Sequence, residues 1–159
     1  GCGQMTAVIQ RAASASVTAD GHLCGRCGRG LFILLGVRVG DTEADAALLA
    51  KKIAALRIFP DEGDKMNRAV SDIGGEILVV PNFTLAADVS HGTRPSFSQA
   101  AAPSAAEALF VHFCTLLREA GLHVETGAFG AHMRVSLEAD GPVTILMDSR
   151  IWKKHDSEN

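Results

Sequence analysis

Alternating apolar and polar residues predict several half-buried strands in this chain. Residues 5–11 and 14–20 alternate in this way, and the Asp20-Gly21 pair that follows is typical of a two-residue hairpin turn. Residues 31–37 form a nearly continuous apolar run, which predicts a buried strand. Further strands are predicted over residues 76–88, 123–127, 131–139 and 143–148.

Two other segments repeat apolar residues at helical spacing. The first begins at Asp41-Thr42, and Asp45 stands at the capping-box distance from Thr42. Its apolar face consists of Ala46, Leu49, Ala50, Ile53 and Leu56. The second begins at Pro103-Ser104, with Glu107 at the matching box position, and ends at Gly121. Its buried stripe consists of Leu109, Phe110, Phe113, Leu116 and Leu117.

These elements predict one α/β domain of the α+β type. Because most predicted strands can pair with close sequence neighbours, we expect a mainly antiparallel sheet that curls toward a barrel, with the two principal helices packed outside. The length of 159 residues suits a single domain with a sizeable core. We assign the domain to residues 5–149. Residues 1–4 are interpreted as a cloning scar or loose extension, and residues 150–159 as a polar C-terminal tail.

Composition narrows the classes of function. The net charge of −3 argues against a protein that coats nucleic acid, but it permits local contacts with one nucleic-acid end. The apolar runs are too short to cross a bilayer, and the first residues lack the pattern of a signal peptide. We therefore expect no membrane association and a cytoplasmic location.

One cysteine pair has a spacing that occurs in redox and zinc sites. Cys24 and Cys27 are separated by two residues, but no second such pair supplies the about four ligands that a zinc site needs. The pair also lies between two strand-like runs, whereas a thioredoxin-like centre starts a helix. We expect incidental thiols and no metal or cofactor. A metal- or redox-sensing role is the alternative.

Two segments at predicted strand ends can present main-chain groups to a ligand. They are Pro81-Asn82-Phe83-Thr84-Leu85 and Gly141-Pro142-Val143-Thr144. A third segment, from Gly127 to Met133, lies between them in the sequence. By these segments, and by ordered matches from Met5 to Ser149, the chain resembles the D-aminoacyl-tRNA deacylases. The matches include Ala7-Val8-Ile9-Gln10-Arg11, Leu34-Leu35-Gly36-Val37, Leu56-Arg57-Ile58-Phe59, Gly74-Gly75-Glu76-Ile77-Leu78-Val79-Val80 and Arg94-Pro95-Ser96-Phe97-Ser98.

The resemblance implies hydrolysis of the ester bond of D-aminoacyl-tRNA, with glycyl-tRNA as an open further substrate. It implies a metal-independent homodimer in which the Gly-Pro corner of one subunit enters the pocket of the other. The expected partner is therefore a tRNA acceptor end that carries a D-amino acid. No cofactor is implied.

The resemblance also implies which residues form the site. The catalytic segment is Asn82, Phe83 and Thr84, with the main-chain amides of Phe83 and Thr84 as oxyanion donors and help from the ribose 2′-hydroxyl of the tRNA. Thr84 as a nucleophile is an alternative, although no activating base is evident beside it in the sequence. No G-x-S-x-G motif indicates a serine-hydrolase triad.

The substrate-binding residues implied are Gly141, Pro142, Met133 and Pro81. The carbonyls of Gly141-Pro142 are expected to face the substrate α-carbon and to leave no space for an L side chain, and Arg11 is expected to brace this corner. The alternative readings are an ordinary turn for Gly141-Pro142, a core residue for Met133 and a surface residue for Arg11.

The chain departs from the family pattern at three places. Pro81 and Asn82 replace a Ser-Gln pair, Ala139 replaces an Asn, and the loop over residues 88–94 keeps Arg94 as its one firm cation. Cations elsewhere could compensate, namely Lys65, Arg68, Arg150, Lys153 and Lys154. These departures leave two alternatives open: a non-catalytic paralogue that binds RNA ends, and an editor of mischarged L-alanyl-tRNA.

Overall fold

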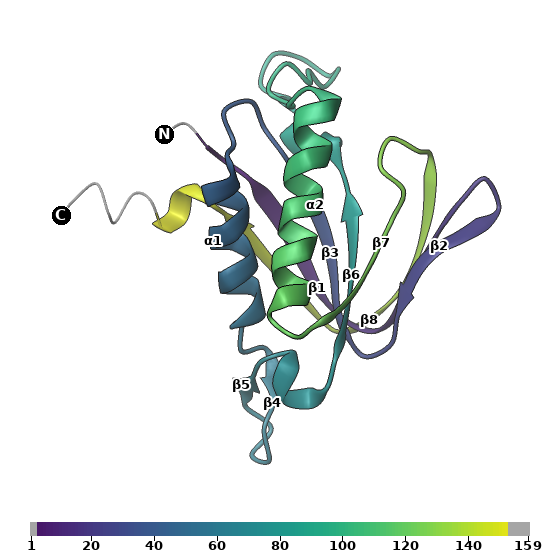
Figure 1. Ribbon diagram of the computed structural model, residues 1–159, viewed down its shortest axis with the longest axis vertical. Coiled ribbons are helices and arrows are strands. Elements are labelled where there is room, and N and C mark those ends of the chain that lie inside the picture. The colour runs from purple at the N-terminus through teal and green to yellow at the C-terminus, as the bar shows by residue number, and fades with distance from the viewer. Residues whose placement is uncertain (1–2, 153–159) are drawn as a thin grey trace.

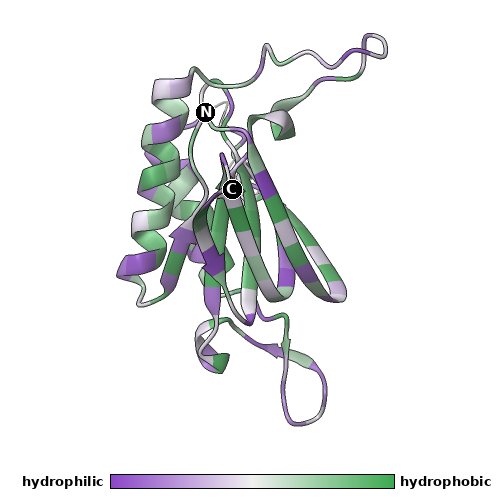
Figure 2. Cartoon of the chain, turned by 90° about the vertical axis from the view of Figure 1, so that its right-hand side faces the viewer, coloured by the Kyte–Doolittle hydropathy of each residue, from purple (hydrophilic) through white to green (hydrophobic). Residues whose placement is uncertain are grey.

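A computed structural model describes residues 3–152, and it shows a curled sheet with two long helices on one of its faces (Figures 1 and 2). The predicted α+β class with two principal helices is confirmed. The strands are β1 (Thr6–Ala19), β2 (His22–Cys27), β3 (Gly30–Gly36), β4 (Phe59–Pro60), β5 (Met66–Arg68), β6 (Glu76–Pro81), β7 (His123–Thr126) and β8 (Met133–Asp148). The helices are α1 (Glu43–Ala54) and α2 (Pro103–Glu119), with 3-10 turns η1 (Ser71–Ile73) and η2 (Phe83–Ala86).

The long strand β1 organises the main sheet. The strand order is β2-β1-β3-β6-β7, and β8 also pairs with β1. The three pairings of β1 are antiparallel, as predicted. The pairings of β6 with β3 and β7 are parallel. These pairings were not predicted, because most strands were expected to pair with their neighbours in the sequence. Parallel neighbours need a crossover connection, and the segments that contain α1 and α2 supply the two crossovers.

The hairpin between β1 and β2 forms where the sequence predicts it. Asp20 and Gly21 both have positive φ angles, 52° and 78°, as a type I′ turn requires. The register Ala19↔His22 places this turn directly between the strands. The two strands predicted over residues 5–11 and 14–20 are one continuous strand, β1.

The position of Gly141-Pro142 differs from the prediction. The strands predicted over residues 131–139 and 143–148 are one strand, β8, and the dipeptide lies inside it. The pairing of β1 with β8 shifts its register between Gln10 and Ser14, opposite this dipeptide. A local irregularity of this kind accommodates a proline within a strand, because proline cannot donate to the ladder. An ordinary turn at Gly141-Pro142 is therefore ruled out.

The strand predicted over residues 76–88 is too long. β6 ends at Pro81, and the chain then forms η2. Asn82 begins this turn, with its side-chain oxygen accepting a hydrogen bond from the Thr84 N–H. Asn is a preferred residue for such a cap, so the strand stops where Asn82 can start a turn.

The two helices begin differently. At α1 the predicted capping box is confirmed, and the Thr42 N–H donates to Asp45 Oδ2 at 2.8 Å. At α2 the predicted box of Ser104 and Glu107 is wrong, because the helix begins two residues earlier than an N-cap at Ser104 would place it. Pro103 is its first residue and Ala102 its N-cap, without a side-chain cap. Proline suits this first position because it lacks the backbone N–H that would have no partner there.

Strand alternation divides the buried side chains between the two faces of the sheet. The larger cluster lies between the sheet and the helices, and it includes Ile9, Leu31, Ile33 and Phe113. The smaller cluster lies on the opposite, concave face and contains Ala12, Ala15, Val17, Cys27, Phe32, Leu78 and Val80. No helix among residues 3–152 has the length and apolar character needed to cross a membrane.

Both ends of the described part of the chain adjoin this fold. Ser149 is fully buried, and its N–H donates to the Met5 carbonyl at 3.0 Å. Trp152 packs against the larger cluster, and Lys52 Nζ lies 5.4 Å from the centre of its ring. The first residues of the segment predicted as a tail thus contact the core. Residues 1–2 and 153–159, with Lys153 and Lys154, lie outside the described residues.

Candidate active site

An apolar pocket of about 340 Å³ lies where β3 and β6 end, beside the start of α2. Its lining is almost entirely aliphatic and aromatic, and no lining residue has a titratable side chain. The lining residues are Leu35, Val37, Pro81, Asn82, Phe83, Ala100, Ala101, Pro103, Ala106, Phe110, Phe129 and Gly130. The rings of Phe110 and Phe129 lie 6.2 Å apart, centre to centre. Such a pocket suits a flat, largely apolar group.

Asn82 acts through its side chain on the turn η2. Its Oδ1 accepts hydrogen bonds from the Thr84 N–H, at 3.2 Å, and from the Thr84 hydroxyl. The Thr84 amide, which the sequence suggested as an oxyanion donor, is therefore already engaged. The Thr84 hydroxyl donates to an amide oxygen, which is not a base that could activate it as a nucleophile.

Phe83 differs from Thr84, because its amide is open. As the first residue of η2, Phe83 has no intrahelical partner for its N–H, and this group makes no hydrogen bond within residues 3–152. The ring of Phe83 is 60% exposed and contacts Phe97 edge to face, with the ring centres 5.1 Å apart. The Phe83 N–H is thus an unpaired main-chain donor on a residue of the pocket wall.

The Gly141-Pro142 corner is exposed on β8, and its peptide bond is cis. Arg11 on β1 holds the residue before it: Nε donates to the Asp140 carbonyl at 3.2 Å and pairs with the Asp140 carboxylate at 3.1 Å. Arg11 also donates from Nη1 to the Ile58 carbonyl at 2.8 Å. With 13% of its side chain exposed, Arg11 is not a surface residue. It fixes the corner by way of Asp140.

The corner and the pocket lie apart within one chain. Gly141, Pro142 and Arg11 are not among the residues that line the pocket. Met133 is half-buried and packs against the smaller apolar cluster. A Cβ on Gly127 would lie 2.8 Å from Met133 Sδ and 3.5 Å from Pro81 Cδ, so Met133 and Pro81 both adjoin Gly127, but Met133 is not among the pocket-lining residues.

Known proteins match almost the whole chain. A family model described as D-Tyr-tRNA(Tyr) deacylase matches residues 8–148. A D-aminoacyl-tRNA deacylase of Paracoccus denitrificans is 58% identical over 145 residues, 91% of this chain and 97% of the relative. One of Roseiflexus castenholzii is 57% identical over 150 residues, 94% of this chain and 96% of the relative. The chain belongs to the D-Tyr-tRNA(Tyr) deacylase family. The predicted family and hydrolase class are confirmed.

Two solved structures have the same fold as this deacylase-family chain. A structure titled c-Myc DNA Unwinding Element Binding Protein superposes with a TM-score of 0.83 at 39% identity, covering 89% of this chain and 97% of the other. A probable eukaryotic D-amino acid tRNA deacylase superposes with a TM-score of 0.79, covering 91% and 99%. At 19% identity, this second likeness shows the fold alone.

The two cysteines of the pair differ in exposure in this deacylase-family protein. Cys24 is exposed and Cys27 is buried, and both thiols are free. Burial raises the pKa of Cys27 to about 11, so its reactive thiolate is scarce at neutral pH. Within residues 3–152, no three His, Cys, Asp or Glu side chains are grouped for a metal ion. The redox and zinc alternative therefore has no geometric support.

Two residues that shape the candidate site were not predicted. A Cβ on Gly36, the last residue of β3, would lie 2.8 Å from Leu85 Cβ and 3.1 Å from the Asn82 carbonyl oxygen. Gly36 therefore lets η2 pack directly against the strand end. A glycine that ends an apolar run can signal such a close approach. Arg38, which contacts Leu85, had no comparable signal in the sequence.

Replacing Gly36 by alanine should displace η2 and lower kcat/KM for the deacylation reaction by about 10–100-fold, because small misplacements of reacting groups are costly. Steady-state kinetics and a thermal unfolding curve would measure this. Gly63→Ala is the matched control, because a Cβ there meets one side-chain atom at 3.4 Å, an ordinary contact, in the exposed segment between β4 and β5. Wild-type kinetics in Gly36→Ala would contradict the importance of this contact.

Proposed function

We propose that this protein hydrolyses the ester bond between a D-amino acid and the terminal ribose of tRNA. The observation that carries the proposal is the pocket beside η2 in a chain of this family, because the pocket combines an apolar recess with an unpaired Phe83 N–H. Relatives named D-aminoacyl-tRNA deacylases match more than nine-tenths of the chain. Because the proposed substrate takes part in translation, we expect the enzyme to act in the cytoplasm.

The pocket is suited to the terminal base of the tRNA. Phe83 and Phe129 offer aromatic surface, and stacking on an aromatic ring contributes about 1–3 kcal/mol per base. The side chain of Asn82 is the polar group of the lining, so recognition there relies on shape more than on charge. A base held in this recess would place the aminoacyl ester near the mouth, where the Phe83 N–H is open.

The chemistry follows from this placement. A water oxygen attacks the ester carbonyl carbon, and the resulting oxyanion accepts a hydrogen bond from the Phe83 N–H. The bond from carbon to the ribose oxygen then breaks, the ribose oxygen takes a proton, and the free D-amino acid leaves. Since no lining side chain titrates, the ribose 2′-hydroxyl is the group left to relay the proton. An aminoacyl ester is already activated, so positioning suffices.

Selection against L-amino acids is assigned to the Gly141-Pro142 corner of a second copy. The corner is exposed and anchored by Arg11, but it does not line the pocket of its own chain. Within the described part of the chain, β8 pairs along one edge, with β1, and Leu146 on β8 is 69% exposed. A homodimer that covers β8 would bring each corner to the partner's pocket, where its carbonyls would exclude an L side chain sterically.

Parallel assays with D-Tyr-tRNA and L-Tyr-tRNA test the proposal. We expect multiple turnovers on the D ester and a rate at least about 100-fold lower on the L ester, as steric exclusion from a rigid site allows. Glycyl-tRNA, which has no side chain to exclude, should also be hydrolysed. Equal rates on the two Tyr esters, or none on either, would contradict the proposal. Turnover of L-alanyl-tRNA alone would favour the alternative editing role, and binding without turnover the non-catalytic one.

A further inference from the structure

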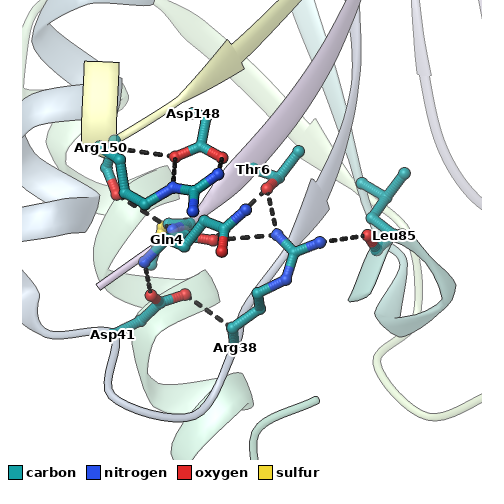
Figure 3. Close-up of polar contacts among 9 residues, drawn as sticks. Gln4, Thr6, Arg38, Asp41, Leu85, Asp148 and Arg150 are labelled. Carbon is teal, nitrogen blue, oxygen red and sulfur yellow. Dashed lines mark hydrogen bonds and ion pairs between the residues drawn. The ribbon is translucent and has the colours of Figure 1, made fainter. Parts of the chain in front are cut away.

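Arg38 lies between β3 and α1, and its guanidinium contacts three residues in two separate segments, the start of β1 and the turn η2 (Figure 3). Nη2 donates to the Leu85 carbonyl at 2.8 Å. Nη1 donates to Thr6 Oγ1 at 2.6 Å and to the Gln4 carbonyl at 3.2 Å. Within residues 3–152 the guanidinium pairs with no carboxylate, so its donors are directed at neutral oxygens.

The contact with Leu85 completes the turn η2. The last carbonyls of a helical turn have no intrahelical partners, and an arginine can supply the missing donors. Asn82 caps the start of η2 and Arg38 caps its end. A four-residue turn is too short to be stable by itself, so its orientation depends on these two caps. Phe83, whose N–H is open at the pocket, lies between them.

The backbone around Arg38 is fixed as well. Its N–H donates to Asp41 Oδ2 at 2.6 Å, and the other carboxylate oxygen of Asp41 accepts the Gln4 N–H. Burial raises the pKa of Asp41, while these two hydrogen bonds act in the opposite direction. Arg38 also forms a β-bridge with Ala100, a residue of the pocket wall. The guanidinium therefore acts from a rigid base.

We infer that Arg38 is a positioning residue, which holds η2 so that the Phe83 N–H points at the reacting carbonyl. Arg38 is not among the pocket-lining residues, so it acts through Leu85 and η2 and not by contact with substrate. The catalytic part of this inference rests on the proposed function. The structural part, that Arg38 orders η2, does not.

The test compares Arg38→Met with Arg118→Met. Arg118 is the matched control, because its Nε and Nη2 also bind a backbone carbonyl, that of Val124, at 3.2 and 2.9 Å. Arg118 lies near the end of α2, whereas the pocket adjoins the start of that helix. On D-Tyr-tRNA, Arg38→Met should lower kcat roughly 10–100-fold, because the change misplaces a reacting group, and its KM should stay within about threefold of the wild-type value. Arg118→Met should keep kcat within about twofold.

Amide hydrogen exchange gives a readout that is independent of activity. The Leu85 and Ala87 N–H groups bond within η2, to the Asn82 and Thr84 carbonyls. Their exchange should become at least about tenfold faster in Arg38→Met and stay unchanged in Arg118→Met, because local opening is governed by local contacts. Arg38→Lys, which keeps a donor but loses the planar fork, should give intermediate values, and it replaces the Met variant if that variant does not fold.

Unchanged exchange in η2, or equal losses of kcat in the Arg38 and Arg118 variants, would overturn the inference. A wild-type protein that hydrolyses no D-Tyr-tRNA would overturn the proposed function instead. In that case the exchange rates still decide whether Arg38 orders η2.

Discussion

Replacing Phe83 by proline is expected to lower kcat for D-Tyr-tRNA by about 10²–10³-fold, the usual effect of removing one oxyanion donor. Proline deletes the Phe83 N–H, which makes no hydrogen bond within the described residues. The fold should tolerate the change, because proline is favoured at the first position of a helical turn and after an extended residue. Asn82, the residue before it, is extended, with ψ of 94°.

Phe83→Ala separates the amide from the ring. It keeps the N–H but removes an exposed ring at the pocket wall, so it should raise KM and change kcat by less than about tenfold, since base stacking is a binding contribution. Single-turnover and steady-state rates for both variants give the comparison. If the alanine and proline variants lose kcat equally, the Phe83 amide has no special role in the reaction.

Replacing Gly141 by alanine should have the second large effect, a loss of at least about 100-fold in kcat/KM for the D ester, because the rigid corner must move. Gly141 has a φ of 127°, where an L side chain is strained. A Cβ there would lie 2.8 Å from Val143 Cγ2, 2.9 Å from the Val143 nitrogen and 3.4 Å from Arg11 Nη2. The preference for D over L esters should fall with the activity.

Gly21→Ala provides the control for backbone strain. Gly21 also has a positive φ, 78°, but a Cβ there would meet nothing within 4 Å. Both variants should lose roughly 1 kcal/mol or more in the free energy of unfolding, as strained positions do. The Gly21 variant should nevertheless retain full activity and full D/L preference. Full activity in Gly141→Ala would contradict the claim that the Gly141-Pro142 corner takes part in the reaction.

Local sequence signals predicted the parts of the fold that local interactions determine. The Asp20-Gly21 turn and the capping box of α1 depend on residues within a few positions of one another, and both form as predicted. The parallel pairings of β6 depend on contacts between distant segments, and pairing between sequence neighbours did not anticipate them. The capping box predicted at α2 does not form, because Pro103, a residue favoured at the first helical position, begins the helix before Ser104.

The site shows the same division. The capping role of Asn82 acts over two residues and follows from the preference of Asn for such positions. The contact of Arg11 with Asp140 spans 129 residues, and that of Arg38 with Leu85 spans 47. No periodicity or composition specifies such pairs. Arg11 was proposed because the chain resembles a family, whereas Arg38 emerged from the geometry alone.

Mixing two inactive variants tests the central claim, that the pocket of one copy works with the corner of another. Phe83→Pro and Gly141→Ala chains, co-purified after joint refolding, would form mixed dimers in which one site has both elements intact. Random pairing makes half of the dimers mixed, so D-Tyr-tRNA hydrolysis should recover to roughly a quarter of the wild-type rate. A mixture no more active than the two variants measured separately would contradict the account.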